Sequence, residues 1–178
     1  MEKKFGENLY SQKLKTAIFL ILSIKSSSPL KKNITLKKAF LGKDDFRHAD
    51  FSGSTIDAVN LSNSDLTYST FYVTKLSNID FSNSDLSFTD FSYSKIENLD
   101  FENTILRNVD FQFSRLLGID FRHSSLEDIN FNQTWCIYCN FDGISMQSII
   151  TLPSSSYNNF PGSTFVGADF RGWDYHKI

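Results

Sequence analysis

Residues 62–91 read SNSDL TYSTF YVTKL SNIDF SNSDL SFTDF, and a large apolar residue closes each group of five. The same spacing runs from Leu36 to Met146 over 23 consecutive positions, of which only Cys136 is small. A period of five fits neither the 3.6-residue turn of a helix nor the two-residue repeat of a strand. A fixed internal period of this kind indicates a repeat architecture.

A second, smaller inward position lies two residues before each large one. It holds Ser or Thr in many units and Val, Ile or Leu in others, as at Ser94 and Ile79. Residues two apart share one face of an extended segment, so each unit can form one side of a coil that closes after four units, or about 20 residues. Sorted by this coil length, Phe fills two opposite columns, which predicts ring ladders along the axis. These columns are Phe51, Phe71, Phe91, Phe111, Phe131 and Leu61, Phe81, Phe101, Phe121, Phe141.

The units SNSDL (62–66), SNIDF (77–81), ENLDF (97–101) and RNVDF (107–111) resemble the pentapeptide-repeat family. The consensus of this family is a small residue, then Asp or Asn, then Leu or Phe, then two free positions. The resemblance implies an all-β fold, a right-handed quadrilateral β-helix of about 20 residues per coil, over about two-thirds of the chain. It says little about function, because one fold serves many roles.

We expect four segments along the chain. Residues 1–33 form a basic, helical cap over the first coil, because an open coil end exposes unpaired strand groups. Residues 34–146 form the β-helix, 147–159 a loop, and 160–178 a final coil in which the five-residue spacing resumes in a new phase. Trp173 and Tyr175 have no obvious cap at that end, which predicts a homodimer through the C-terminal coil. The apolar run at 16–24 is too short to span a membrane, which takes roughly 18 residues or more, and Glu2 and Glu7 argue against a signal peptide.

Charge is distributed unevenly along the chain. The net charge is −2, but residues 1–43 carry +8 and residues 44–146 carry −10. The position before each large residue points outward, and the constant coil length aligns it in columns on the four faces. The expected partner-binding columns are Asp80, Asp100 and Asp120; Asp90 and Asp110 on the opposite face; Asp65 and Asp85; and Lys75, Lys95 and Arg115, followed by Trp135.

Two interpretations of the acidic columns stay open. Short carboxylates at turns bond to local backbone groups, which is a purely structural role. Rows of aligned carboxylates would also give the rod a surface that resembles a nucleic-acid duplex. Like charges opposite one another on neighbouring strands repel, so the alignment needs one of these reasons.

When the five-residue spacing assigns each polar residue to a face of the coil, no group of catalytic residues comes together. We therefore expect neither an enzyme nor a cofactor nor a metal. Cys136 and Cys139 spell C-x-x-C, a spacing also found in redox pairs and in half zinc sites. Both fall on inward positions, so we interpret them as free cysteines packed in the core. Two cysteines make no disulfide scaffold, which favours a reducing compartment and a cytoplasmic bacterial protein.

Three functions are compatible with these features. The first is a non-enzymatic scaffold that binds a protein partner through its charged outer faces, without direct nucleic-acid binding. The second, which the resemblance implies, is an acidic duplex mimic that binds DNA gyrase and protects it from quinolones. The third is a secreted bacterial effector, because proteins of that kind also contain such repeats.

Overall fold

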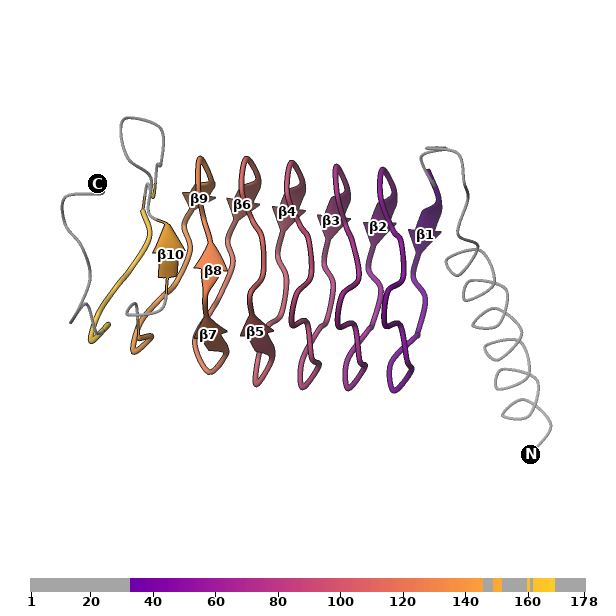
Figure 1. Ribbon diagram of the computed structural model, residues 1–178, viewed down its shortest axis with the longest axis horizontal. Coiled ribbons are helices and arrows are strands. Elements are labelled where there is room, and N and C mark those ends of the chain that lie inside the picture. The colour runs from indigo at the N-terminus through magenta and orange to yellow at the C-terminus, as the bar shows by residue number, and fades with distance from the viewer. Residues whose placement is uncertain (1–32, 146–148, 152–159, 161, 169–178) are drawn as a thin grey trace.

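A computed structural model describes residues 33–145, 149–151, 160 and 162–168 of the chain. The described part is a rod of stacked coils (Figure 1). Each coil contributes short strands or single bridges that pair in parallel with the coils before and after it. The strands are β1 (Thr35–Lys37), β2 (Thr55–Asp57), β3 (Lys75–Ser77), β4 (Lys95–Glu97), β5 (Ile105–Arg107), β6 (Arg115–Leu117), β7 (Ser125–Glu127), β8 (Ile129–Asn130), β9 (Trp135–Ile137) and β10 (Ile149–Thr151).

The pairing register follows the predicted coil length. Leu36 lies beside Ile56, and Ile56 beside Leu76, in the six-stranded sheet β1-β2-β3-β4-β6-β9. The other faces repeat the same step through isolated bridges such as Asp80 to Asp100. The predicted right-handed quadrilateral β-helix is therefore confirmed, and every described residue outside its strands lies in bridges, turns, bends or irregular backbone.

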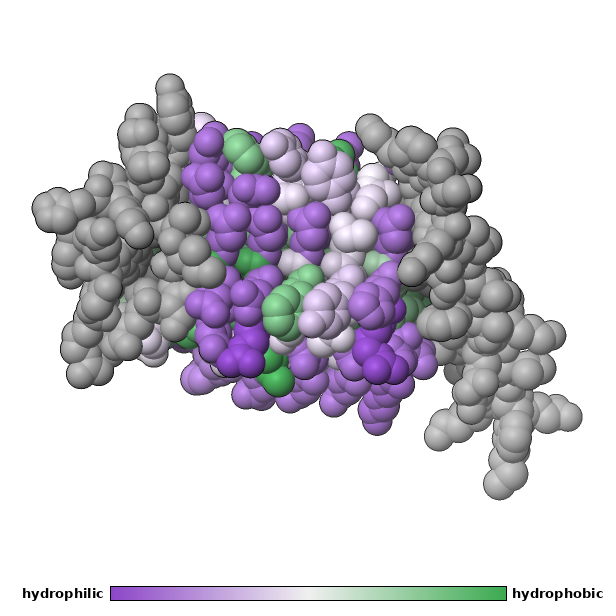
Figure 2. Space-filling view, in the orientation of Figure 1, coloured by the Kyte–Doolittle hydropathy of each residue, from purple (hydrophilic) through white to green (hydrophobic). Residues whose placement is uncertain are grey.

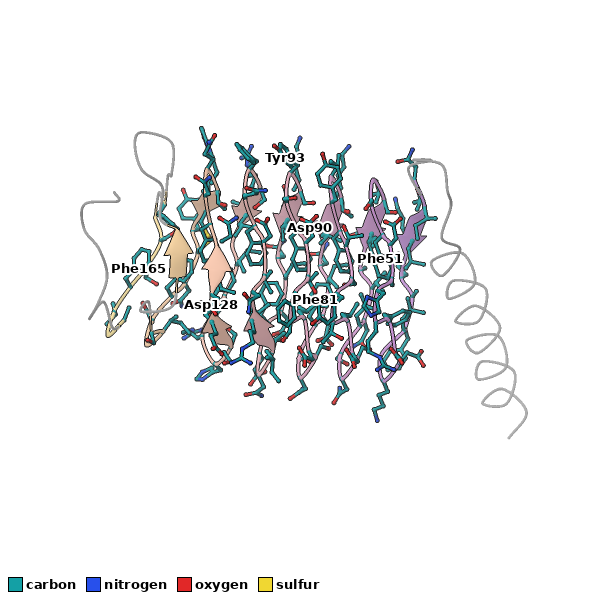
Figure 3. All side chains as sticks on the ribbon, viewed as in Figure 1. Phe51, Phe81, Asp90, Tyr93, Asp128 and Phe165 are labelled. Carbon is teal, nitrogen blue, oxygen red and sulfur yellow. A yellow bond between two sulfur atoms is a disulfide. The ribbon has the colours of Figure 1, made fainter. Side chains whose placement is uncertain are left out.

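Two ladders of phenylalanine rings fill the interior, as the column pattern predicts (Figure 3). Rings from Phe51 to Phe131 stack with centroids 4.6–5.4 Å apart. Rings from Phe81 through Phe141 to Phe165 stack at 4.8–5.8 Å. The two ladders meet edge to face across the lumen, and this geometry is favourable for aromatic quadrupoles.

Each corner of the rod places one residue in the left-handed backbone region. It lies two residues after the large inward residue, and its φ is 51–65° at the non-glycine positions. Asn tolerates this conformation better than other non-glycine residues. It occupies six of these corners, at Asn63, Asn78, Asn83, Asn98, Asn103 and Asn108.

Hydroxyl groups in the small inward position bond to the neighbouring coil. The Ser84 hydroxyl donates to the carbonyl of Leu61 (2.9 Å) and accepts from the N–H of Ser64 (3.1 Å). Thr104 and Thr134 donate in the same way to carbonyls of the preceding coil, at 3.0 and 2.7 Å. The abundant serines and threonines thus satisfy backbone groups that the rod buries.

The register changes near the C-terminal end. The sequence predicts a loop at 147–159, but Ile149–Thr151 pair as β10 with β8. Ile149 lies beside Ile129, at the same spacing as in the coils before it, whereas Thr164 bridges to Asn140 across a longer stretch of chain. This coil is therefore longer than the others. The β-bulge between Ile149 and Thr151 begins the shift.

The two cysteines differ from the expectation in one respect. Both lie at buried inward positions, but they form a disulfide instead of packing as free thiols. Consecutive inward slots bring their Cα atoms to 5.7 Å, within the span that a disulfide can bridge. The predicted cap at 1–33 lies, apart from its last residue, outside the described residues, as do Trp173 and Tyr175 of the proposed dimer end.

Candidate protein-binding surface

The four outward columns lie where the predicted coil length places them. Backbone bridges join Asp80 to Asp100 and Asp100 to Asp120, and other bridges join Asp90 to Asp110 and Asp65 to Asp85. The basic column follows β3, β4, β6 and β9, where Lys75 pairs in register with Lys95, Lys95 with Arg115, and Arg115 with Trp135. In the view of Figure 2 the exposed surface is mostly hydrophilic, with a few hydrophobic residues among the polar ones.

Every aspartate of the acidic columns bonds to nearby backbone. One carboxylate oxygen of Asp80 accepts the N–H of Ser82, two residues later, at 2.9 Å. The same bond, at 2.8–3.0 Å, forms at Asp65, Asp85, Asp90, Asp100, Asp110 and Asp120. Asn60, Asn130 and Asn140 make it with their amide oxygens. A turn-stabilising role explains why Asp or Asn occupies this position.

Arginines neutralise part of the acidic surface. Arg122 donates to the carboxylate of Asp120 at 2.6 Å, and this hydrogen bond lowers the pKa of Asp120. Arg47 does the same for Asp45, whose pKa is lowered to about 2, and it also approaches Asp65 at 3.7 Å. Arg107 pairs with Glu127 at 2.7 Å. On the opposite face, burial and then the charge of Asp90 raise the pKa of Asp110.

Within the described part of the chain, the basic column has no such compensation. Lys75, Lys95 and Arg115 are exposed, and none of them forms a salt bridge with a described residue. Glu97 follows Lys95 on the same strand, and this exposed side chain also forms no ion pair inside the described ranges. Three like charges therefore stand in register on adjacent strands, an arrangement that repels.

A set of exposed aromatic residues at the corners was not predicted from the sequence. Tyr93 and Phe113 stack at 4.7 Å, and Tyr72 meets Tyr93 edge to face at 5.6 Å. On another corner His48, Tyr68 and Phe88 stack at 5.2 and 4.7 Å. The signal in the sequence was an aromatic residue at the same corner position of successive coils, at Tyr93 and Phe113 and at Tyr68 and Phe88.

These corner aromatics adopt a backbone that does not favour them. Tyr93 has φ 59° and Phe113 has φ 56°, and a bulky residue there costs roughly 1–2 kcal/mol. Tyr93 remains 49% and Phe113 38% exposed, so burial recovers only part of that cost. Because every corner of the rod adopts this conformation, the specific feature of these two corners is the aromatic side chain. Figure 3 places Tyr93 at the edge of the rod beside β4.

The amino-acid sequence of the repeat region matches a known family. Residues 58–131 match the family described as pentapeptide repeat region. This part of the chain is a pentapeptide-repeat region. No curated protein sequence matches it.

Solved structures similar to this chain come from varied sources. A trypsin-treated variant of QnrB1, a plasmid-mediated fluoroquinolone resistance protein, is 17% identical and aligns over 80% of this chain and 68% of its own, with a TM-score of 0.44. A protein of the Arabidopsis thaliana thylakoid lumen is 20% identical over 61% of this chain and 75% of its own, with a TM-score of 0.36. HetL of Nostoc sp. strain PCC 7120, involved in regulating heterocyst differentiation, is 10% identical over 79% and 88%, with a TM-score of 0.24.

The pentapeptide-repeat rod also has a charged recess. Asp100, Glu102, Asp120, Arg122 and His123 line it, and Arg122 is already bound to Asp120. In the described residues, no three His, Cys, Asp or Glu side chains gather in a way that could hold a metal. The described part also contains no helix with the length and apolar character of a membrane span.

Proposed function

We propose that this protein is a non-enzymatic scaffold that binds a protein partner through its charged outer faces, chiefly the basic column. The observation that carries the proposal is the register of Lys75, Lys95 and Arg115, which lack ion-pair partners among the described residues. Two unit charges about 5 Å apart repel by about 0.8 kcal/mol in water, and by more when water is excluded. A bound acidic partner offsets this repulsion.

The scaffold role also fits the use of the polar side chains. Buried hydroxyls, such as that of Ser84, donate hydrogen bonds to backbone carbonyls, and the outward aspartates stabilise turns. A catalytic nucleophile needs an adjacent base, and neither arrangement supplies one. Rigid rungs instead fix side chains at repeated spacings, which suits recognition of an extended surface.

A capture experiment tests the scaffold proposal. A photo-crosslinking residue placed at Lys95 in the full-length protein is expected to form a covalent adduct with a partner in cells that express the protein. The same residue placed at the exposed Ser125 of β7, which belongs to a different sheet from the basic column, is expected to give no such adduct.

The charge of the column is tested with a matched pair of variants. The triple variant K75E/K95E/R115E, carrying a crosslinker at Trp135, is expected to lose the adduct. K37E/K38E/K43E, with the same change in net charge on the first coil, is expected to keep it. Equal adducts in the two variants would contradict a role for the basic column.

A second candidate, a duplex mimic that binds DNA gyrase, is favoured by the acidic register. Asp80, Asp100 and Asp120, with Asp90 and Asp110 opposite, give two carboxylates per coil. With rungs roughly 4.8 Å apart this is about one charge per 2.4 Å, against about 1.7 Å in duplex DNA. The basic column and the pairing of Arg122 with Asp120 reduce the resulting field.

A supercoiling assay decides this second candidate. Purified gyrase is titrated with the protein, with and without a quinolone, and compared with the variant D80N/D100N/D120N. Asn60 and Asn140 already make the same turn bond, so this variant is expected to fold normally. Inhibition or drug protection that is lost in the variant would establish the mimic. If the wild-type protein has no effect on gyrase at any concentration, the duplex-mimic candidate is wrong.

A further inference from the structure

The corner aromatics lie directly beside the basic column. Tyr93 comes two residues before Lys95, and Phe113 two residues before Arg115, with only the buried Ser94 or Ser114 between them. Tyr72 extends the aromatic cluster toward the preceding coil, where Lys75 continues the cations. We define these six residues, Tyr72, Tyr93, Phe113, Lys75, Lys95 and Arg115, as the basic–aromatic stripe.

The three aromatic residues and Arg115 give the stripe residue types that are enriched in binding surfaces, whereas its two lysines are of a type that is depleted there. Tyr and Arg are enriched among the residues that dominate protein interfaces. At this corner the chain keeps Tyr93 and Phe113 in a strained backbone conformation, although Asn serves at six equivalent corners. The three rings also remain 38–49% exposed, so burial in the fold accounts for only part of their apolar surface.

We propose that the stripe binds an α-helix of a protein partner, one whose acidic residues recur every three to four positions beside an apolar row. This inference rests on the proposed scaffold function and names the partner's chemistry. The aromatic rings would pack on the apolar row, and the three cations would pair with three carboxylates.

The spacing of the rungs selects a helix over an extended segment. Three rungs of the β-helix span roughly 9.6 Å along the axis. Acidic residues at positions i, i+3 and i+7 of a helix span roughly 10.5 Å, within reach of flexible Lys and Arg side chains. Three residues on the same side of an extended strand span roughly 13 Å, so they do not stay in register with the three cations.

The charge of the rod favours a protein partner over a nucleic acid. Residues 33–145 contain nine Lys and Arg against sixteen Asp and Glu, a net charge of −7. The acidic columns on the other faces would repel a phosphate backbone, whose binding relies on many cationic contacts. A short acidic helix needs only the stripe itself.

Fluorescence anisotropy with a designed probe tests the inference. The probe is a labelled helical peptide of about 18 residues with Glu at i, i+3 and i+7 beside a row of Leu and Phe. Its control is an isomer of equal composition and helicity with the glutamates dispersed around the helix. A labelled oligothymidine tests the nucleic-acid alternative. The full-length protein is expected to bind the patterned peptide at least about tenfold more tightly than the isomer.

Variants identify the surface that binds the probe. K75E/K95E/R115E and Y93N/F113N are each expected to weaken binding at least about tenfold. The matched control Y68N/F88N changes the other aromatic corner and is expected to leave binding unchanged. Asn is already the residue at six such corners, so both asparagine variants should fold.

The outcomes separate this inference from the scaffold function. Equal binding of the two peptides, tighter binding of oligothymidine, or no binding of either peptide would overturn the helix proposal. If the crosslinked partner is also lost on charge reversal, the scaffold function stands and only the helix assignment fails. If no partner is captured but the patterned peptide binds through the stripe, the surface is a helix site and the capture test for the scaffold has failed.

Discussion

Replacing Phe91 with alanine is expected to lower the free energy of unfolding by about 3–5 kcal/mol. The Phe91 ring is fully buried, and it stacks between Phe71 at 4.9 Å and Phe111 at 5.2 Å. It also meets Phe81 edge to face across the lumen. Alanine would therefore remove three ring contacts and open a cavity in the middle of the ladder. The cavity cannot collapse easily, because parallel backbone hydrogen bonds fix the coils above and below.

Equilibrium unfolding in guanidinium chloride, followed by circular dichroism, measures this loss. Phe91→Leu keeps most of the volume and is expected to cost clearly less than the alanine variant. Phe88→Asn is the surface control, because Phe88 is exposed at a corner where asparagine is favourable. A loss below about 1 kcal/mol for Phe91→Ala would contradict a closely packed ring ladder.

Replacing Ser84 with alanine is expected to cost about 2–4 kcal/mol, although only one oxygen is removed. The hydroxyl is the hydrogen-bond partner of both the Leu61 carbonyl and the Ser64 N–H, and all three residues are buried. Alanine would leave these two backbone groups buried without that partner. Each such group costs roughly 1–3 kcal/mol.

Ser94→Ala provides the matched control for this experiment. Ser94 makes the equivalent bonds, to the Phe71 carbonyl at 2.6 Å and from the Thr74 N–H at 2.9 Å. Here, however, the Thr74 N–H also bonds to the Phe71 carbonyl at 3.2 Å, so neither group is left without a partner. We expect a smaller loss for Ser94→Ala in the same denaturation assay. An equal loss in both variants would show that unsatisfied backbone groups do not set the cost.

Much of the fold could be predicted because a strict period converts sequence distance into spatial position. Once the coil length is known, Phe71 must lie under Phe91, and Lys75 beside Lys95. The ring ladders and the outward columns follow from that single number. The choice of Asp or Asn before each large residue also pointed to a turn bond, which the structure contains.

The candidate site was predicted less completely, because the column pattern gives the position of each charged residue but not which residues form ion pairs. The sequence aligned Asp120 with Asp80 and Asp100, but only the folded rod brings Arg122 back onto Asp120 while Lys95 forms no ion pair within the described residues. The corner aromatics could not be predicted from the inward pattern or the charge pattern, because they belong to neither. The spacing of 20 residues between Tyr93 and Phe113 nevertheless places them at the same corner of two successive coils.

The repeat, the length of the coil, the aromatic core and the face of each outward residue all follow from the sequence, because a five-residue period leaves one register that buries every large side chain. The change of phase after Met146 already indicated the longer coil before Thr164. The tertiary structure alone decided the disulfide between Cys136 and Cys139 and the strand at Ile149–Thr151. It also decided which carboxylates an arginine neutralises. These features depend on contacts between side chains and coils at particular distances, and periodicity carries no information about such distances.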